Sequence, residues 1–68
     1  MRLLEEIVLL ADEWEAVKFC DEEGLKQIEA AKKLKISLPT LQRTLASARQ
    51  KIAEALVKGK AIRIEEKS

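Results

Sequence analysis

Residues 27–45 read QIEAAKKLKISLPTLQRTL, and this stretch decides the fold. Apolar residues recur at helical spacing on both sides of Lys35, which predicts two helices joined by a short turn. Ala31 lies where the two crossing helices approach closely, so a small side chain is required there. Larger apolar side chains are expected to fill the wedge between the helices: Leu34, Ile36, Leu41 and Leu45. The spacing is typical of a helix-turn-helix, although an ordinary helical hairpin has a related pattern.

The helix after the turn is the longest one that the sequence predicts. Ser37 is expected to cap it, and Pro39 falls in its first turn, where a missing amide hydrogen costs little. The helix is expected to continue to about Val57 and to end at Gly59. Its inward face is expected to carry Leu41, Leu45, Ala48, Ile52 and Leu56. The shorter helix before the turn is expected over residues 27–34, and its inner face is expected to carry Ile28, Ala30, Ala31 and Leu34.

The first helix is expected over residues 13–22. Asp12 is a good N-cap, and Glu15 follows three residues later, as in a capping box. Gly24 is expected to end the helix in the left-handed conformation. Two side chains of this helix are interpreted as core residues: Trp14 and Cys20.

Short strands are expected at both ends of the chain. The apolar run EEIVLL at residues 5–10 favours a strand, although the first turns of a longer helix fit it as well. Residues 60–65 alternate polar and apolar side chains, with Ile62 and Ile64 on one face. An isolated strand has no partner, so each candidate supports the other. The fold class is therefore mainly α, a three-helix helix-turn-helix domain over residues 1–68, with the motif at about 27–57 and short terminal strands.

Composition excludes several classes of function. The 68 residues contain no His, no Tyr, a single Cys and no glycine-rich phosphate loop, so we expect no enzyme activity, no metal and no cofactor. No apolar run approaches the roughly 18 residues that a membrane span needs. No signal peptide is recognisable, because Glu5 and Glu6 interrupt the N-terminal apolar stretch. The lone Cys20 excludes an internal disulfide and favours the reducing cytoplasm.

Charge is distributed unevenly along the chain. Residues 1–23 carry a net charge of −6 and residues 24–60 carry +7, although the whole chain has only +1. Such opposed halves can present one strongly positive face to a polyanion. They also fit a dipolar domain whose halves simply attract each other, and composition alone leaves both interpretations open.

Double-stranded DNA is the partner that the helix-turn-helix pattern favours. The N-terminal half of the second helix of such a motif enters the major groove, where Gln pairs with adenine and Arg with guanine. Candidate base contacts are Leu38, Pro39, Gln42, Arg43 and Ala46. Candidate phosphate contacts are Lys26, Gln27, Lys32, Lys33, Lys35, Ser37, Thr40, Arg49 and Lys51.

A family resemblance covers nearly the whole chain. It rests on EEIVL at 5–9, DEWEA at 12–16, EGL at 23–25, Gln27, EAA at 29–31, Ser37, Pro39-Thr40, Gln42-Arg43, SAR at 47–49, KIA at 51–53 and ALVKGKA at 55–61. These residues resemble the region-four helix-turn-helix of sigma factors. More closely, the chain is similar to a family of uncharacterised prokaryotic proteins for which DNA binding is predicted. The resemblance implies sequence-dependent DNA binding in transcriptional regulation.

The chain departs from the family pattern at several points. Lys26 replaces the hydroxyl residue that usually caps the second helix. Lys35 replaces a glycine in the turn, so either Lys35 adopts a strained left-handed conformation or the turn has a different shape. Leu38 replaces an arginine and removes one expected DNA contact. Members of the family that the chain resembles usually have a longer N-terminal segment, often with cysteines, that has no counterpart in these 68 residues. No metal or redox role tied to that segment is therefore expected here.

Association with other proteins is the alternative function. Region-four-like domains also bind protein partners, and the loss of an arginine at Leu38 suits such a role. A homodimer through the terminal strands is a further expectation, because exposed sheet edges and symmetric DNA sites both favour dimers. The sequence leaves open whether the strands pair within one chain or between two.

Overall fold

The computed structural model describes residues 4–65 of the chain. Along this range the elements are β1 (Glu6–Leu9), α1 (Ala11–Val17), a π-helical turn η1 (Lys18–Glu22), α2 (Gln27–Leu34), α3 (Leu38–Lys58) and β2 (Ala61–Ile64). The mainly α fold with short terminal strands is thus confirmed. Residues 1–3 and 66–68 of the expected domain lie outside the described range. No helix in the described range is long and apolar enough to cross a membrane.

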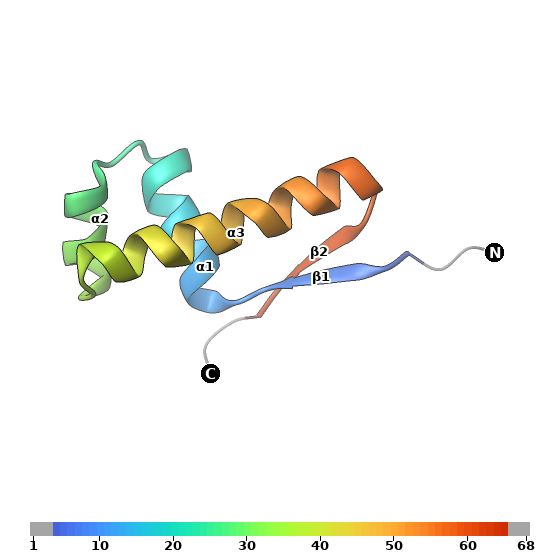
Figure 1. Cartoon of the computed structure of the whole chain (residues 1–68), viewed down its shortest axis with the longest axis horizontal. Coiled ribbons are helices and arrows are strands. Elements are labelled where there is room, and N and C mark those ends of the chain that lie inside the picture. The colour runs from blue at the N-terminus through green and yellow to red at the C-terminus, as the bar shows by residue number, and fades with distance from the viewer. Residues whose placement is uncertain (1–3, 66–68) are drawn as a thin grey trace.

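The two strands pair with each other within one chain, which answers the question that the sequence left open. They run in parallel, with Glu6 opposite Ala61 and Leu9 opposite Ile64. Parallel strands need a long crossover connection, which the three helices supply here. The strand pair lies beneath the C-terminal half of α3, while α1 and α2 pack beside its N-terminal half (Figure 1).

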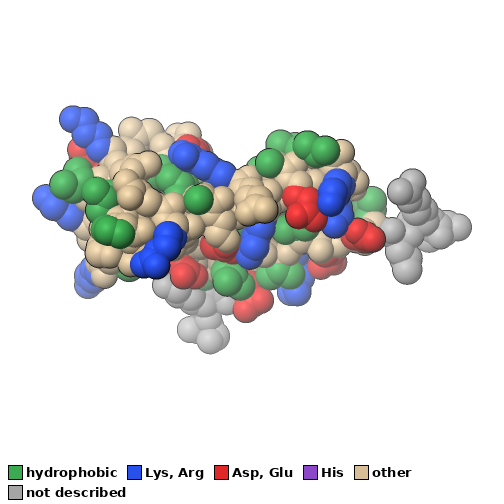
Figure 2. Space-filling view, in the orientation of Figure 1, with side chains coloured by type: hydrophobic (Ala, Val, Ile, Leu, Met, Phe, Trp, Pro, Cys, Tyr) green, Lys and Arg blue, Asp and Glu red, His purple; other side chains and the backbone are tan. Residues whose placement is uncertain are grey.

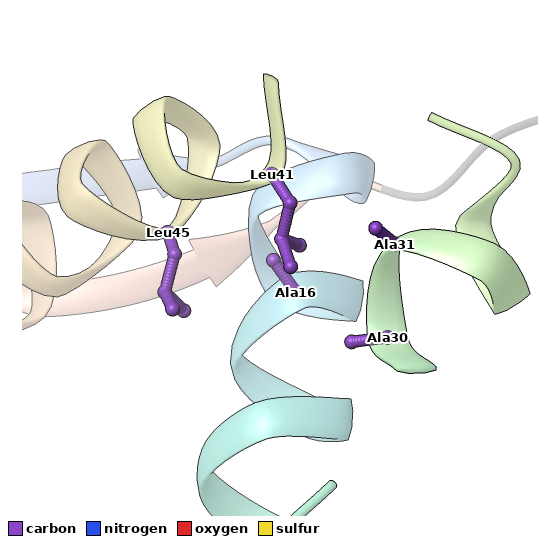
Figure 3. Packing of buried hydrophobic residues seen from close by; sticks show 5 residues of the cluster. All are labelled: Ala16, Ala30, Ala31, Leu41 and Leu45. Carbon is purple, nitrogen blue, oxygen red and sulfur yellow. The ribbon is translucent and has the colours of Figure 1, made fainter. Parts of the chain in front are cut away.

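The core lies where the three helices meet. Its buried members are Ala16, Ala30, Ala31, Leu41 and Leu45. Figure 3 shows these side chains converging from α1, α2 and α3 on one space. The alanines leave room for close helix approach, and the two leucines of α3 fill the space between. The expected positions of Ala31, Leu41 and Leu45 are confirmed, and Leu34 and Ile36 pack half-buried against this cluster.

Two residues expected to face inward lie on the surface instead. Ile28 is 55% exposed and Leu56 is 77% exposed, so both of these predictions are wrong. Ala55 is buried in place of Leu56. Toward its C-terminal end, α3 extends past the other helices and covers the strands, so a different side of the helix faces inward there. Trp14 and Cys20, which were expected in the core, are half-buried.

The start of α1 also differs from the expectation. The helix begins at Ala11, and Leu10 rather than Asp12 is the N-cap residue. Glu13, at the third helical position, accepts a hydrogen bond of 2.9 Å from the Leu10 backbone N–H. The predicted capping box of Asp12 and Glu15 is therefore wrong by two residues. Half of its chemistry is retained, because a glutamate three residues after the cap still satisfies the amide of the cap residue, whereas the leucine side chain has no acceptor for the amide of Glu13.

The turn between α2 and α3 has the backbone conformation that glycine usually provides, although it contains no glycine. Lys35 ends α2 in the left-handed region, with φ of 57° and ψ of 43°. The Ile36 N–H donates to the Ala31 carbonyl at 3.0 Å, as in a Schellman motif. Ser37 caps α3 as expected, since its side chain accepts from the Thr40 N–H. Of the two alternatives that the sequence left open for this turn, a strained left-handed residue or a different turn, the structure shows the first, with Lys35 as the strained residue.

Candidate nucleic-acid interface

Most of the candidate base contacts gather on one exposed face of α3. Pro39, Gln42, Arg43 and Ala46 are all exposed, and Leu38 is 37% exposed at the start of the helix. Pro39, Arg43 and Ala46 lie on the side of α3 opposite the buried Leu41 and Leu45, and Gln42 lies at the border of that side. Leu38 lies three residues before Leu41, so it is on the same side of the helix as the two leucines. The structure therefore places four of the five selected residues on one exposed surface, whereas Leu38 lies beside that surface at the start of α3.

The first turn of α3 is fixed by hydroxyl groups. Ser37 Oγ donates to Thr40 Oγ1 at 2.8 Å and accepts from the Thr40 N–H at 3.3 Å. Both residues were predicted as phosphate contacts, and in the structure their hydroxyl groups take part in capping the helix. Ser37 is exposed, whereas Thr40 is half-buried.

A side-chain hydrogen bond joins α2 to this surface. Gln42 Nε2 donates to Gln27 Oε1 at 3.2 Å, and both side chains are exposed. Gln27 is the first residue of α2, and its N-cap, Lys26, provides no side-chain cap. A predicted phosphate contact and a predicted base contact are thus in direct contact with each other.

Five cations surround the start of α3 without an acidic partner. Among residues 4–65, no ion pair is formed by Lys26, Lys32, Lys33, Lys35 or Arg43. All five are exposed. Lys33 Nζ lies 5.4 Å from the centre of the Phe19 ring, a cation–π contact that leaves its charge uncompensated. Figure 2 shows Lys and Arg side chains at several points around the end of the molecule that α2 and the start of α3 form.

Arg49 and Lys51, also predicted as phosphate contacts, are engaged within the protein. Arg49 forms two hydrogen bonds to Asp21 of η1, of 3.1 and 2.7 Å, and these raise the pKa of the guanidinium further. Lys51 Nζ lies 2.7 Å from Glu13 Oε1 and 3.3 Å from the Val8 carbonyl. The sequence showed only that Arg49 and Lys51 lie on a basic helix. Their acidic partners, Asp21 and Glu13, are distant in the chain and could not be recognised from the sequence.

Glu13 is the one buried charged residue in the described range, at 5% exposure. Burial acts to raise the pKa of its carboxyl, but hydrogen bonds from Lys51, Ser47 and the Leu10 amide outweigh burial and hold the pKa below its ordinary value. The carboxylate is therefore ionised and fully hydrogen-bonded. It joins the start of α1 to α3, and its partner Lys51 extends the connection to β1, which is a structural role that sequence analysis missed.

The remaining described cations are paired as well. In each pair a side-chain nitrogen lies between 2.8 and 4.0 Å from a carboxylate oxygen. The pairs are Lys18 with Glu23, Lys58 with Glu54, Lys60 with both Glu54 and Glu5, and Arg63 with Glu6. The surface around the strands and the end of α3 is consequently close to neutral. Apolar side chains stand out there instead, with Leu56 and Val57 77% and 84% exposed (Figure 2).

Groups suited to metal or nucleophilic chemistry do not cluster in the part of the chain that the structure describes. No set of three or more His, Cys, Asp or Glu side chains there is placed to hold a metal ion. Cys20 is half-buried, and burial together with the neighbouring Asp21 raises the pKa of its thiol. The thiol is therefore protonated near neutral pH and is a poor nucleophile.

Comparison with known proteins places the chain among relatives from bacteria. Residues 2–67 match the family described as "Protein of unknown function DUF134". The chain is 54% identical over 65 residues to a UPF0251 protein of Caldanaerobacter subterraneus subsp. tengcongensis, covering 96% of this chain and 55% of that protein. It is 55% identical over 65 residues to a UPF0251 protein of Dehalococcoides mccartyi, covering 96% of this chain and 56% of that protein. The chain thus spans about half the length of these relatives, and no solved structure matches it.

Proposed function

We propose that this chain, which belongs to the DUF134 family, binds double-stranded DNA by placing the start of α3 in the major groove. The succession of α2, a short turn and α3 supports this proposal, because a helix-turn-helix needs two such helices, and the sequence resembles the region-four type of this motif. The role proposed for the domain is sequence-dependent binding in transcriptional regulation. A cytoplasmic location belongs to the same proposal, because bacterial chromosomal DNA is there.

The distribution of unpaired charge carries this proposal. The five described cations without an acidic partner all lie in or next to the helix pair: Lys26, Lys32, Lys33, Lys35 and Arg43. Every other described cation has a carboxylate within 4.0 Å. A dipolar domain whose halves merely attract each other would pair the central cations too. The uncompensated charge instead suits a polyanion that lies along α2 and α3.

Base readout is assigned to the exposed face of α3. Arg43 is suited to donate two hydrogen bonds to guanine, and Gln42 is suited to pair with adenine. Leu38, Pro39 and Ala46 supply apolar contacts such as those made with thymine methyl groups. The four unpaired lysines are assigned to phosphates, together with the uncapped amide groups at the start of α2. Arg49 and Lys51 are omitted from the contact set, because intrachain carboxylates already bind them.

Salt dependence of binding to a labelled mixed-sequence duplex tests the proposal. Four lysine–phosphate contacts predict a slope of about −4 in log K against log salt, which is roughly a hundredfold loss of affinity between about 50 and 200 mM. Lys33→Ala is expected to make the slope less steep by about 1, and Arg43→Ala to lower affinity and relax sequence preference. The matched control for Lys33→Ala is Lys58→Ala, which removes an equal charge from the C-terminal end of α3, far from the proposed surface.

Each outcome is decisive. Binding with this slope, weakened by Lys33→Ala and Arg43→Ala but not by Lys58→Ala, supports the proposed surface. Equal effects of Lys33→Ala and Lys58→Ala would refute the assignment of the surface. Absence of binding at low salt would refute DNA binding itself and leave protein association as the function of this helix pair.

The opposite end of the molecule favours a second candidate function, association with another copy of the chain. Leu56 and Val57 are exposed beside a two-stranded sheet whose outer edges are open, and the charges nearby are paired internally. A neutral apolar surface of this kind meets its own copy without like-charge repulsion. Sedimentation at high micromolar concentration tests it: a dimer that Leu56→Lys dissociates supports this function, and a monomer refutes it.

A further inference from the structure

The hydrogen bond between Gln27 and Gln42 links the two helices that the proposed function places on DNA. Gln42 Nε2 is the donor and Gln27 Oε1 the acceptor, 3.2 Å apart. The two residues are 15 positions apart in the chain, and both side chains are exposed at the surface assigned to DNA. Neither side chain is needed for the core, because neither belongs to the buried cluster.

We propose that Gln27 is a positioning residue that makes Gln42 select adenine over guanine at one base pair. This inference rests on the proposed function and adds to it the identity of a base. It concerns the orientation of the Gln42 amide, which Gln27 fixes by accepting one of its two N–H groups.

The remaining hydrogen-bonding groups of Gln42 match adenine. A glutamine amide has two N–H donors and one carbonyl acceptor. After one N–H is donated to Gln27, Gln42 retains one donor and one acceptor for the major groove. Adenine presents N7 as an acceptor and N6–H₂ as a donor, so it pairs with both.

Guanine does not match the same orientation. Its major-groove edge presents two acceptors, N7 and O6, and therefore requires two donors. With one N–H held by Gln27, the remaining N–H of Gln42 can donate to N7, but the carbonyl oxygen of Gln42 then faces O6, an acceptor that is left without a donor. Without Gln27, both N–H groups of the Gln42 amide become available to guanine. Discrimination between the two purines thus depends on a residue that touches neither base.

Gln27 can hold this position and contact the backbone of DNA at the same time. Its carbonyl oxygen is directed to Gln42, so its own two N–H groups remain available for a phosphate oxygen. It lies at the start of α2, where the neighbouring Lys26 and the uncapped amides also favour an anion. A bound phosphate would therefore fix Gln27, and through it Gln42, in the orientation described.

The test compares variants on duplexes that differ at a single base pair. The preferred site is first selected by the wild-type domain from a pool of random duplexes, and the position read by Gln42 is the one at which Gln42→Ala loses preference. At that position the wild type is expected to prefer adenine over guanine by about tenfold or more. Gln27→Ala is expected to reduce this ratio to within about threefold, while the salt dependence stays close to that of the wild type.

Gln27→Glu is the matched variant. Its carboxylate still accepts the N–H of Gln42, so the preference for adenine is expected to persist, while the added negative charge weakens binding to every duplex. Thermal unfolding of both variants is expected to match that of the wild type, because Gln27 is exposed.

The outcomes separate this inference from the proposed function. If Gln27→Ala binds DNA and keeps the full adenine preference, or if the wild type binds without preferring adenine at any position, the inference is overturned while DNA binding stands. If the wild type binds no duplex at low salt, the proposed function fails and the inference fails with it. Loss of preference in Gln27→Ala together with its retention in Gln27→Glu supports the inference.

Discussion

Lys51 of α3 lies 2.7 Å from Glu13 of α1, and the carboxylate of this pair is almost completely buried. The same carboxylate accepts hydrogen bonds from Ser47 Oγ and from the Leu10 amide. One acidic side chain therefore joins the start of α1 to the middle of α3, and Lys51 extends the connection to the Val8 carbonyl of β1. Arg49, two residues earlier in α3, pairs with Asp21 in the same way at the surface.

Glu13→Gln is expected to destabilise the domain by about 1–3 kcal/mol, because it leaves the Lys51 ammonium without its charged partner. The value is below that of a fully buried pair, since a third of the Lys51 side chain is exposed to solvent. Urea unfolding measures the change. Glu22→Gln, which removes an exposed carboxylate from η1, is the control and is expected to change stability by less than about 0.5 kcal/mol. Equal stability of the two variants would contradict the structural role of Glu13.

Stability is expected to fall in acid as Glu13 becomes protonated. Its pKa in the folded protein lies below the ordinary value near 4.5, so folding favours the ionised form. The stabilisation is fully present above pH 4.5 and is lost as the pH falls through the lower folded-state pKa. Urea unfolding between neutral pH and about pH 3 is expected to show this loss in the wild type and a flatter profile in Glu13→Gln. Identical pH profiles for both proteins would show that another group is responsible.

Lys35→Gly is expected to stabilise the fold and to weaken DNA binding. Glycine adopts the left-handed conformation of residue 35 without steric cost, but it also has greater conformational freedom in the unfolded chain. The net increase in the free energy of unfolding is therefore about 0.5–1 kcal/mol. Removal of the charge is expected to make the salt slope less steep by about 1.

Lys35→Ala is the matched control for that change. It removes the same charge but keeps a Cβ atom in the left-handed conformation, so it is expected to weaken DNA binding without the gain in stability. Thermal unfolding in which the glycine variant melts no higher than the alanine variant would contradict the assignment of strain to this turn.

Ala31→Val is expected to destabilise the domain by about 1–3 kcal/mol, because Ala31 is 4% exposed where α2 approaches the other helices and two added methyl groups have no space. Ala53→Val, at an exposed position of α3, introduces the same side chain with only the loss of helix propensity, roughly 0.6 kcal/mol. The midpoints of urea unfolding distinguish the two. Similar midpoints would mean that close helix packing does not require alanine at residue 31.

The sequence predicted the helix pair well because its signals are local. The bounds of α2 agree with the prediction, and those of α3 agree to within one residue. Ser37 and Gly59 act within one turn of their own positions, so the sequence around them is sufficient to place the ends of α3. The exposed face of Gln42 and Arg43 follows from the same helical spacing.

The residue buried near the C-terminal end of α3 and the residue at which α1 begins were less predictable. Leu56 continues the apolar spacing of α3, yet Ala55 is the buried residue, because the partner of α3 changes from helices to strands along its length. Similarly, Asp12 is a better N-cap than Leu10 by local preference. The helix nevertheless starts at Ala11, where Glu13 reaches both the Leu10 amide and Lys51.

By itself, then, the sequence determined three helices, their turns and the face of α3 that carries Gln42 and Arg43, since each depends on residues within a few positions of one another. Tertiary structure alone decided which charges are free. Nothing local distinguishes Arg43 from Arg49 or Lys33 from Lys51, yet Arg49 and Lys51 meet Asp21 and Glu13, which lie 28 and 38 residues away in the chain. A charge is neutralised by whatever the fold brings within about 4 Å of it, and that distance is set by packing between elements rather than by the residues beside it in sequence.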